Sequence, residues 1–262
     1  MRGKIQAGVA AALCAALLLA GCSATEKGNG KTLPVREAVQ SAERQFTAPQ
    51  DGDTIAIFDT SLGEIRAVLY PDAAPMAVYN FVGLARSGYY DGSVIWRSQY
   101  AFAVQGGDAT GTGTGGSTIW NNSPLPLEAD AGLKHYAGAL CAAFAEKGGN
   151  SQFYFVTALP GLDDAARGEL SANGYTEEQI AAYTAAGGLP YLDNTDSVFG
   201  QIYSGLEVAD AMACVDTVLN EDGTDTSRPT EDAAITIHSV AITTYPGPAP
   251  ATAEEADPAK SD

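Results

Sequence analysis

Basic residues are scarce in this sequence of 262 residues. Lysine and arginine together number 14, against 32 aspartates and glutamates, so the formal net charge is −18 at pH 7. A chain this acidic has little electrostatic attraction for nucleic-acid phosphates or for anionic lipid headgroups. We therefore expect no nucleic-acid binding and no charge-driven binding to a membrane.

Histidine is also rare, with only His135 and His238 in the chain. They lie far apart and lack the serine or cysteine partner that nucleophilic catalysis needs, so we interpret His135 as structural. Residues 220–223 (Asn-Glu-Asp-Gly) resemble part of a calcium loop, but Val218 occupies the first ligand position and Pro229 the twelfth. We interpret this segment as an acidic turn, and we expect neither a metal nor another cofactor.

A dinucleotide-binding loop is missing too, although Gly111, Gly113 and Gly116 have the spacing of its fingerprint. That motif requires a helix directly after it, because the phosphate rests on the N-terminus of the helix. Residues 117–126 contain two prolines and two asparagines, which disfavour such a helix. The glycines are therefore interpreted as a turn.

Long apolar runs are absent, and the run Val9–Ala20 is too short to span a bilayer. It follows Arg2 and Lys4 and leads into Leu19-Ala20-Gly21-Cys22, which is typical of a signal peptide ending at a lipoprotein cleavage site. We predict removal of residues 1–21 and lipidation of Cys22. The protein would then sit in the bacterial cell envelope, lipid-anchored to the membrane and facing outside the cytoplasm. The alternative is an ordinary secretory signal followed by an unmodified cysteine.

The remaining chain divides by composition into three parts. Residues 22–52 begin polar, with a helix-like patch at residues 35–46, and we interpret them as a lipidated cysteine and a tether. Residues 53–243 form one predicted domain, with an insert at 158–190. Residues 244–262 are rich in proline, alanine and acids and are predicted to be a disordered tail.

Short apolar runs bounded by turn residues predict the strands of this domain. They are residues 54–58, 64–70, 94–97, 102–105, 138–143, 152–157, 198–203 and 234–242. Amphipathic segments predict helices at 76–86 and 206–215, and a capping-box spacing from Thr176 to Gln179 predicts a third at 177–186. The fold class is therefore mainly β: a closed eight-stranded antiparallel barrel capped by two helices, with an extra helical insert.

Several motifs follow one another in a recognisable order. They include Thr60-Ser-Leu-Gly63, Trp96-Arg97, Phe102, Gln105-Gly-Gly-Asp108, Gly113-Thr-Gly-Gly116, Asn150-Ser-Gln-Phe153, Leu192-Asp193 and Val198-Phe-Gly200. Through these motifs the chain resembles the cyclophilins, a family of peptidyl-prolyl cis/trans isomerases, over about residues 53–242. The resemblance implies a cyclophilin-like barrel and activity on proline-containing polypeptides. We expect the protein to act as a monomer.

The resemblance also assigns the site. Arg97 would make the catalytic contact, although an arginine paired with an acid is the alternative interpretation of this residue. The substrate-binding positions would be Phe102, Gln105, Ala143, Phe144, Gln152, Tyr154, Tyr191, Leu192 and Asp196. Within this set Phe102, Tyr154 and Leu192 would form the proline socket, and the two glutamines would hold the substrate backbone.

Four positions depart from the family pattern. The family's pocket methionine, phenylalanine, tryptophan and histidine are Ala103, Tyr154, Tyr191 and Asp196 here. Two functions therefore remain open: an active isomerase that assists the folding of exported or surface proteins, and a cyclophilin-fold module that binds proline-containing segments with little turnover. A solute-binding lipoprotein would need two α/β lobes, which the pattern does not predict.

Four cysteines are present. Cys14 would leave with the signal peptide and Cys22 would carry lipid, so Cys141 and Cys214 would remain in an oxidising compartment. The resemblance places one on a barrel strand and the other at the end of a helix. We therefore expect two separate thiols, with a disulfide between them as the alternative.

Overall fold

The computed structural model describes residues 30–130, 132–145 and 148–246. The chain divides into two units, residues 1–32 and 33–262, and in the first unit the three described residues form no helix or strand. The predicted signal peptide, the lipidated Cys22 and residues 247–262 of the predicted tail lie outside the described residues. In the part of the chain that is described, no helix is long and apolar enough to cross a membrane.

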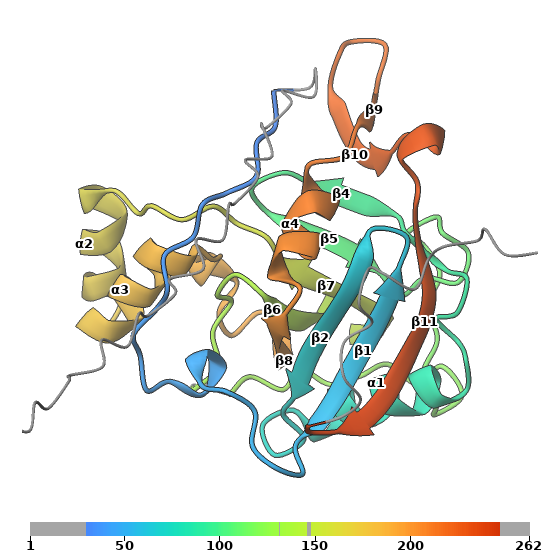
Figure 1. Ribbon diagram of the computed structural model, residues 1–262, viewed down its shortest axis with the longest axis horizontal. Coiled ribbons are helices and arrows are strands. Elements are labelled where there is room, and N and C mark those ends of the chain that lie inside the picture. The colour runs from blue at the N-terminus through green and yellow to red at the C-terminus, as the bar shows by residue number, and fades with distance from the viewer. Residues whose placement is uncertain (1–29, 131, 146–147, 247–262) are drawn as a thin grey trace, which may run out of the picture. The chain divides into compact units, whose positions relative to one another are not determined.

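Nine strands form one antiparallel sheet in the order β3-β11-β1-β2-β8-β6-β7-β5-β4 (Figure 1). Their bounds are β1 Thr54–Thr60, β2 Gly63–Leu69, β3 Val94–Ile95, β4 Arg97–Gln99, β5 Ala103–Gly106, β6 Ala139–Ala145, β7 Gly148–Val156, β8 Ser197–Ser204 and β11 Ile235–Thr244. The two end strands, β3 and β4, are separated only by Trp96 and together make up the strand predicted at 94–97. The sheet is thus a nearly closed barrel of the eight predicted strands, and the mainly β fold is confirmed.

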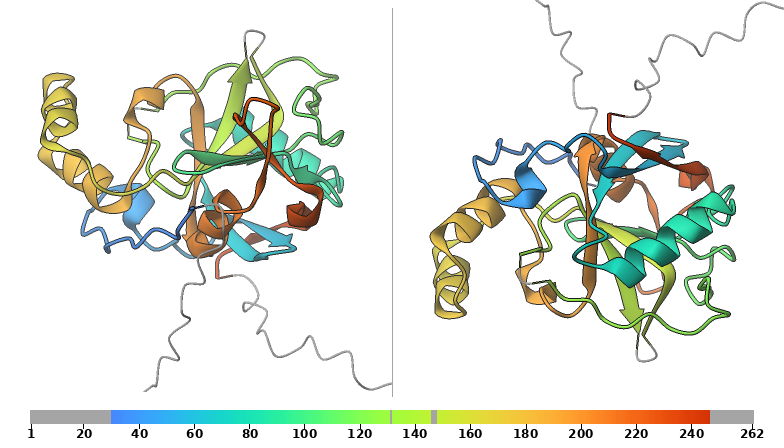
Figure 2. Two further views of the ribbon diagram at one scale, coloured as in Figure 1. Left: turned by 90° about the horizontal axis from the view of Figure 1, so that it is seen from above. Right: turned by 90° about the horizontal axis from the view of Figure 1, so that it is seen from below.

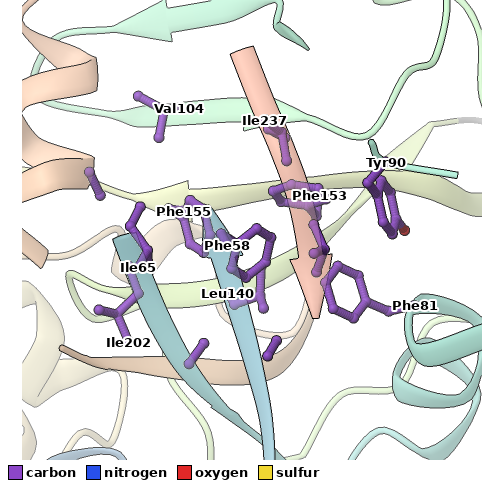
Figure 3. Packing of buried hydrophobic residues seen from close by; sticks show 14 of the residues in the cluster. Phe58, Ile65, Phe81, Tyr90, Val104, Leu140, Phe153, Phe155, Ile202 and Ile237 are labelled. Carbon is purple, nitrogen blue, oxygen red and sulfur yellow. The ribbon is translucent and has the colours of Figure 1, made fainter. Parts of the chain in front are cut away.

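Aromatic side chains fill the interior of the barrel (Figure 3). The ring of Phe58 on β1 lies 5.4 Å from that of Phe153 and 5.0 Å from that of Phe155, both on β7, measured between centroids. Phe81, on the helix that covers one mouth of the barrel, lies 5.7 Å from Phe58. Because side chains alternate along a strand, Tyr154 points to the outer face while its two neighbours fill the core.

Both helices predicted to cap the barrel are present: α1 spans Pro75–Arg86 and α4 spans Leu206–Ala213. Pro75 begins α1, where its missing N–H costs nothing. The next two N–H groups, of Met76 and Ala77, each donate to the carboxylate of Glu128 at 2.9 Å. A carboxylate from a distant loop therefore caps the helix in place of a local side chain.

The insert contains two helices, α2 (Asp164–Ala172) and α3 (Glu177–Ala186), which lie to one side of the barrel, away from α1 (Figures 1 and 2). The capping box is confirmed: the Thr176 hydroxyl accepts from the Gln179 N–H at 3.1 Å, and the Gln179 side chain accepts from the Thr176 N–H at 3.2 Å. The sequence did not predict α2. Helix α2 buries only Leu170 and contains Gly168, so its apolar periodicity is too weak to predict a helix.

A second, two-stranded sheet was not predicted either. Strands β9 (Thr217–Leu219) and β10 (Asp225–Pro229) pair around the acidic turn, which the Gly223 N–H closes by donating to the Asn220 carbonyl. The turn was predicted correctly, but the short flanking segments carry mostly polar residues. Arg228 of β10 donates to the carbonyls of Gly111 and Thr112 at 3.0 and 2.9 Å, which ties this hairpin to the glycine-rich turn.

Residues 33–49 of the predicted tether pack against the barrel and the insert. We call residues 33–49 the strap. Its only regular structure is a short 3-10 helix, η1 (Arg44–Phe46), so the helix-like patch at residues 35–46 does not form an α-helix. The buried Gln45 side chain donates to the Gln201 side chain of β8 at 2.8 Å. Contacts to the folded domain, rather than local helix propensity, fix the conformation of the strap.

Arg36 anchors the strap at a second point. Its guanidinium donates to the Asp210 carboxylate of α4 at 2.6 and 3.0 Å, to the Ala158 carbonyl after β7 at 2.9 Å, and to the Ala186 carbonyl at the end of α3. Both members of the ion pair are largely buried. One side chain thus joins the strap, the barrel and the insert.

We expect Arg36→Ala to lower the free energy of unfolding by about 3 to 5 kcal/mol, because it leaves the buried Asp210 carboxylate without its cation. Urea unfolding at pH 7 measures the loss. The matched control is Arg167→Ala, which removes an exposed ion pair with Asp164 and should cost less than about 1 kcal/mol. Equal small losses in both variants would show that the strap is not anchored through Arg36.

Candidate active site

A cavity of about 330 Å³ opens on the outer face of the barrel beside β4, β5, β6 and β7. It is lined by Arg97 and by eight of the nine predicted substrate-binding residues: Phe102, Gln105, Ala143, Phe144, Gln152, Tyr154, Leu192 and Asp196. The ninth, Tyr191, is 66% exposed and stands outside the lining. A larger cavity of about 720 Å³, between the strap and the helices of the insert, contains none of these residues.

Strand pairing brings the central residues together. Arg97 lies opposite Gln105 in the pair β4–β5, and Gln105 lies opposite Tyr154 in the pair β5–β7. Directly opposed residues share a face of the sheet, so these three side chains form one row across three strands. Residues that are 57 positions apart in the chain thereby line the same cavity.

Arg97 carries the only positive charge among the described residues that line the cavity. Its guanidinium donates to the Gln99 side chain and, at 3.5 Å, to the Gln105 side chain, and it lies 4.8 Å from the centre of the Phe102 ring. Within the described chain no carboxylate lies in ion-pair range of it, so the described residues offer no acid for the alternative of a paired arginine. Burial lowers the pKa of Arg97 from its usual value, while the nearby Tyr191 and Tyr154 act in the opposite direction.

The two glutamines connect this arginine to the glycine-rich turn. The Gln105 amide donates to the Gln152 side-chain oxygen at 3.0 Å, and the Gln152 amide donates to the carbonyls of Gly113 and Gly115 at 3.2 and 2.7 Å. Both N–H bonds of Gln152 are therefore occupied within the protein. The Gln105 amide donates only one of its two N–H groups to described residues, whereas the geometry makes Gln152 a support for Gln105 and for the turn.

Asp108 organises the glycine-rich turn from its centre. The fully buried carboxylate accepts from the N–H groups of Thr110, Gly113 and Gly115 at 2.8, 2.7 and 3.0 Å. A Cβ on Gly115 would lie 2.2 Å from an Asp108 oxygen, and one on Gly113, whose φ is +86°, would lie 2.8 Å from the Trp96 ring. These glycines allow the turn to pack closely around the Asp108 carboxylate. Residues 117–123, which follow the turn, contain no helix.

Tyr154 and Asp196, two of the four residues that depart from the family pattern, are hydrogen-bonded to each other. The Tyr154 hydroxyl donates to the Asp196 carboxylate at 2.7 Å at one end of the cavity. Burial raises the pKa of Asp196, although the hydrogen bond from Tyr154 opposes this. The third departure, Ala103, is buried in the same apolar cluster as Tyr154 and Cys141 and does not line the cavity. No disulfide joins Cys141 and Cys214, which agrees with the expectation of two separate thiols.

The wall that carries Tyr191, Leu192 and Asp196 is held by a residue that the sequence analysis missed. Asp193 is buried, and one of its carboxylate oxygens accepts from the insert hydroxyls of Tyr175 and Tyr183 at 2.7 and 2.8 Å. The other oxygen contacts the backbone N–H and ring Nδ1 of His135 at 2.8 and 2.9 Å. His135 is buried behind Tyr154, with 6.3 Å between the two ring centroids, and does not line the cavity. This agrees with a structural role, and the insert lies beside the site as predicted.

Comparison with known proteins agrees with this geometry. Residues 55–241 match the model of the family described as cyclophilin type peptidyl-prolyl cis-trans isomerase/CLD. A Streptococcus pyogenes protein named as a bifunctional phosphatase/peptidyl-prolyl cis-trans isomerase is 38% identical over 178 residues, 67% of this chain and 36% of its own length. A Staphylococcus epidermidis protein named as a peptidyl-prolyl cis-trans isomerase is 33% identical over 166 residues, 63% and 83% of the two chains.

Solved structures support the fold. A Cryptosporidium parvum cyclophilin type peptidyl-prolyl cis-trans isomerase, crystallised in the presence of the dipeptide Ala-Pro, aligns with a TM-score of 0.53 and 24% identity over 72% of this chain and 98% of its own. A second structure of a protein with the same description gives a TM-score of 0.56 at 22% identity, over 74% and 99%. At these identities the likeness concerns the fold alone.

The bonds around Asp108 predict how the turn responds to acid. Burial by itself would raise the pKa of Asp108, but hydrogen bonds from Thr110, Gly113 and Gly115 outweigh it and lower the pKa from 3.8 to about 2. The carboxylate therefore stabilises the fold fully above pH 4, and this contribution is lost as the pH falls from about 4 to 2. We expect Asp108→Asn to cost roughly 2 kcal/mol at pH 7.

Urea unfolding of the parent and of Asp108→Asn at several pH values measures this effect. The difference between the two proteins should shrink as the pH falls from about 4 towards 2, because the parent then loses the charge that the variant already lacks. A difference that stays constant over this range would contradict the assignment. The exposed Glu169→Gln variant on α2 serves as the control and should show no such trend.

Proposed function

Because the chain belongs to the cyclophilin-type peptidyl-prolyl cis-trans isomerase family, we propose that it isomerises Xaa-Pro bonds in exported or surface proteins as they fold, while held at the membrane by lipid on Cys22. The observation that carries the catalytic part is Arg97. It is a charged guanidinium without a carboxylate partner among the described residues, set beside the apolar ring of Phe102 in an open cavity.

The reaction needs neither a nucleophile nor a redox step. Amide resonance resists rotation about the Xaa-Pro bond by about 18 to 20 kcal/mol. In the twisted state resonance is lost and the prolyl nitrogen regains its lone pair, which can accept a hydrogen bond from Arg97. One charge-assisted hydrogen bond made mainly in that state contributes roughly 1.5 to 3 kcal/mol, or about 10- to 150-fold in rate.

The surroundings hold Arg97 ready for this contact. Its partners Gln99 and Gln105 are neutral, so they orient the guanidinium without cancelling its charge. Donors fixed in place before the reaction require no reorganisation when the transition state forms. The rest of the acceleration comes from binding the twisted conformer better than the planar ones, with Phe102 and Leu192 as the apolar surfaces for the proline ring.

A binding module with little turnover remains the second candidate. The observation that favours it is the polar pair Tyr154–Asp196, which stands where the family has a phenylalanine and a histidine. A hydroxyl and a carboxylate beside the socket reduce the apolar surface offered to a proline ring. Such a module would bind proline-containing segments through the same cavity.

We expect Arg97→Ala to lower kcat/KM at least about tenfold while the thermal midpoint changes little, because the residue acts on the transition state rather than the core. Arg97→Lys should restore little, since a point charge does not reproduce the planar fork of donors. An isomerisation assay on proline peptides measures both. Arg86→Ala, at the exposed end of α1, is the matched control, and an Arg97→Ala variant as active as the parent would refute the assignment.

The anchor is tested separately. We expect Cys22→Ser to release the protein from the membrane fraction and to abolish labelling by a palmitate analogue in the living bacterium, because the thiol carries the lipid. Cys14→Ser is the control, since this cysteine lies within the predicted signal peptide and its loss should change neither result. Labelled, membrane-bound Cys22→Ser protein would place the anchor elsewhere.

A further inference from the structure

We propose that Asp196 makes the cavity selective for client segments in which a lysine or arginine stands next to the proline. This inference rests on the proposed function, because it concerns the substrate of the same cavity. Of the described residues that line the cavity, Arg97 is the only basic residue and Asp196 the only acidic one. Arg97 lies at one end of the row formed with Gln105 and Tyr154, and Asp196 contacts Tyr154 at the other end.

Among the described residues the Asp196 carboxylate forms no ion pair. It accepts a hydrogen bond from a neutral phenol, the Tyr154 hydroxyl at 2.7 Å, and in the described chain no lysine or arginine nitrogen lies within 4.0 Å of it. The side chain is half-buried. Burial raises its pKa and outweighs the hydrogen bond from Tyr154 and the electrostatic effect of the nearby His135, which lower it.

A cation from the substrate would relieve this cost. Partial burial weakens screening by water and salt, so an ion pair formed in the cavity is stronger than the same pair on an open surface. An acidic neighbour would be repelled by Asp196 for the same reason. The carboxylate therefore discriminates by sign, which the histidine of the family pattern would not do at neutral pH.

Geometry fixes how near the proline this cation must be. Arg97 and Tyr154 lie two strands apart, which is about 10 Å across a sheet. A proline whose nitrogen faces Arg97 therefore places the Asp196 carboxylate within reach of a long side chain on the adjacent residue. The flexible four-carbon stem of lysine, or the fork of arginine, spans such a gap, whereas a short polar side chain does not.

Tyr154 acts here as a positioning residue. Its hydroxyl fixes one carboxylate oxygen of Asp196 and leaves the net charge unchanged. Replacing the phenol by phenylalanine should free the carboxylate without removing its charge, so the preference for a cation should survive. Replacing Asp196 by asparagine keeps an acceptor for the phenol and removes the charge alone.

The test uses peptides that differ only in the residue before or after proline, namely lysine, glutamine or glutamate. Exchange NMR measures isomerisation without a helper protease, and shift titration measures Kd whether or not turnover occurs. We expect the parent to favour the lysine peptide over the glutamate peptide by about tenfold, in kcat/KM or in Kd. In Asp196→Asn this ratio should fall to nearly one, and in Tyr154→Phe it should persist.

Two controls separate the inference from other effects. Because the whole chain is acidic, Glu169→Gln on the exposed face of α2 removes one negative charge far from the cavity and should leave the ratio unchanged. Each ratio is taken within one variant, so a change in absolute rate does not count. A parent without a preference, a preference for glutamate, or an undiminished ratio in Asp196→Asn would each overturn the inference. Failure to isomerise even the glutamine peptide would instead refute the proposed catalytic function.

Discussion

Antiparallel pairing of β5 with both β4 and β7 is the constraint on which the site depends. It sets Arg97, Gln105 and Tyr154 side by side on the outer face, while the alternating residues Phe153 and Phe155 fill the core. A slip of one residue in either pair would exchange these faces. The packed aromatic interior therefore fixes the register, and the register fixes the cavity.

Around this row local chains of hydrogen bonds connect the side chains of the site to the glycine-rich turn. Gln152 donates both side-chain N–H groups to carbonyls of the glycine-rich turn, and Asp108 accepts hydrogen bonds from backbone N–H groups of the same turn. Buried polar groups left without partners are costly, so each bond that secures the turn also secures Gln105 and, through it, Arg97. Tyr154 and Asp196, which replace the family's phenylalanine and histidine, also satisfy each other's hydrogen-bonding needs, because the hydroxyl donates to the carboxylate.

The sequence was informative where a local pattern decides the structure. Short apolar runs bounded by turn residues predicted all eight strand segments of the barrel. The Thr176 to Gln179 spacing predicted the start of α3, and the glycines after Ala186 predicted its end. The sequence was not informative where contacts between distant residues determine the conformation. The strap reads as a polar tether with a helical patch, because nothing local shows that Arg36 will meet Asp210 across 174 residues. Asp193 reads as part of a motif, and its link to Tyr175 and Tyr183 becomes visible only in the folded insert.

These distant contacts explain how an insert outside the barrel bears on the cavity. Tyr175 and Tyr183 hold Asp193, whose neighbours form the cavity wall, and Arg36 ties the end of α3 to the barrel and to α4. The wall segment carries one short 3-10 turn, Pro190–Leu192, and has few backbone bonds of its own to fix it. A segment of this kind takes its position from what it packs against. The strap and the insert thus belong to the scaffold that places Leu192 and Asp196 opposite Arg97.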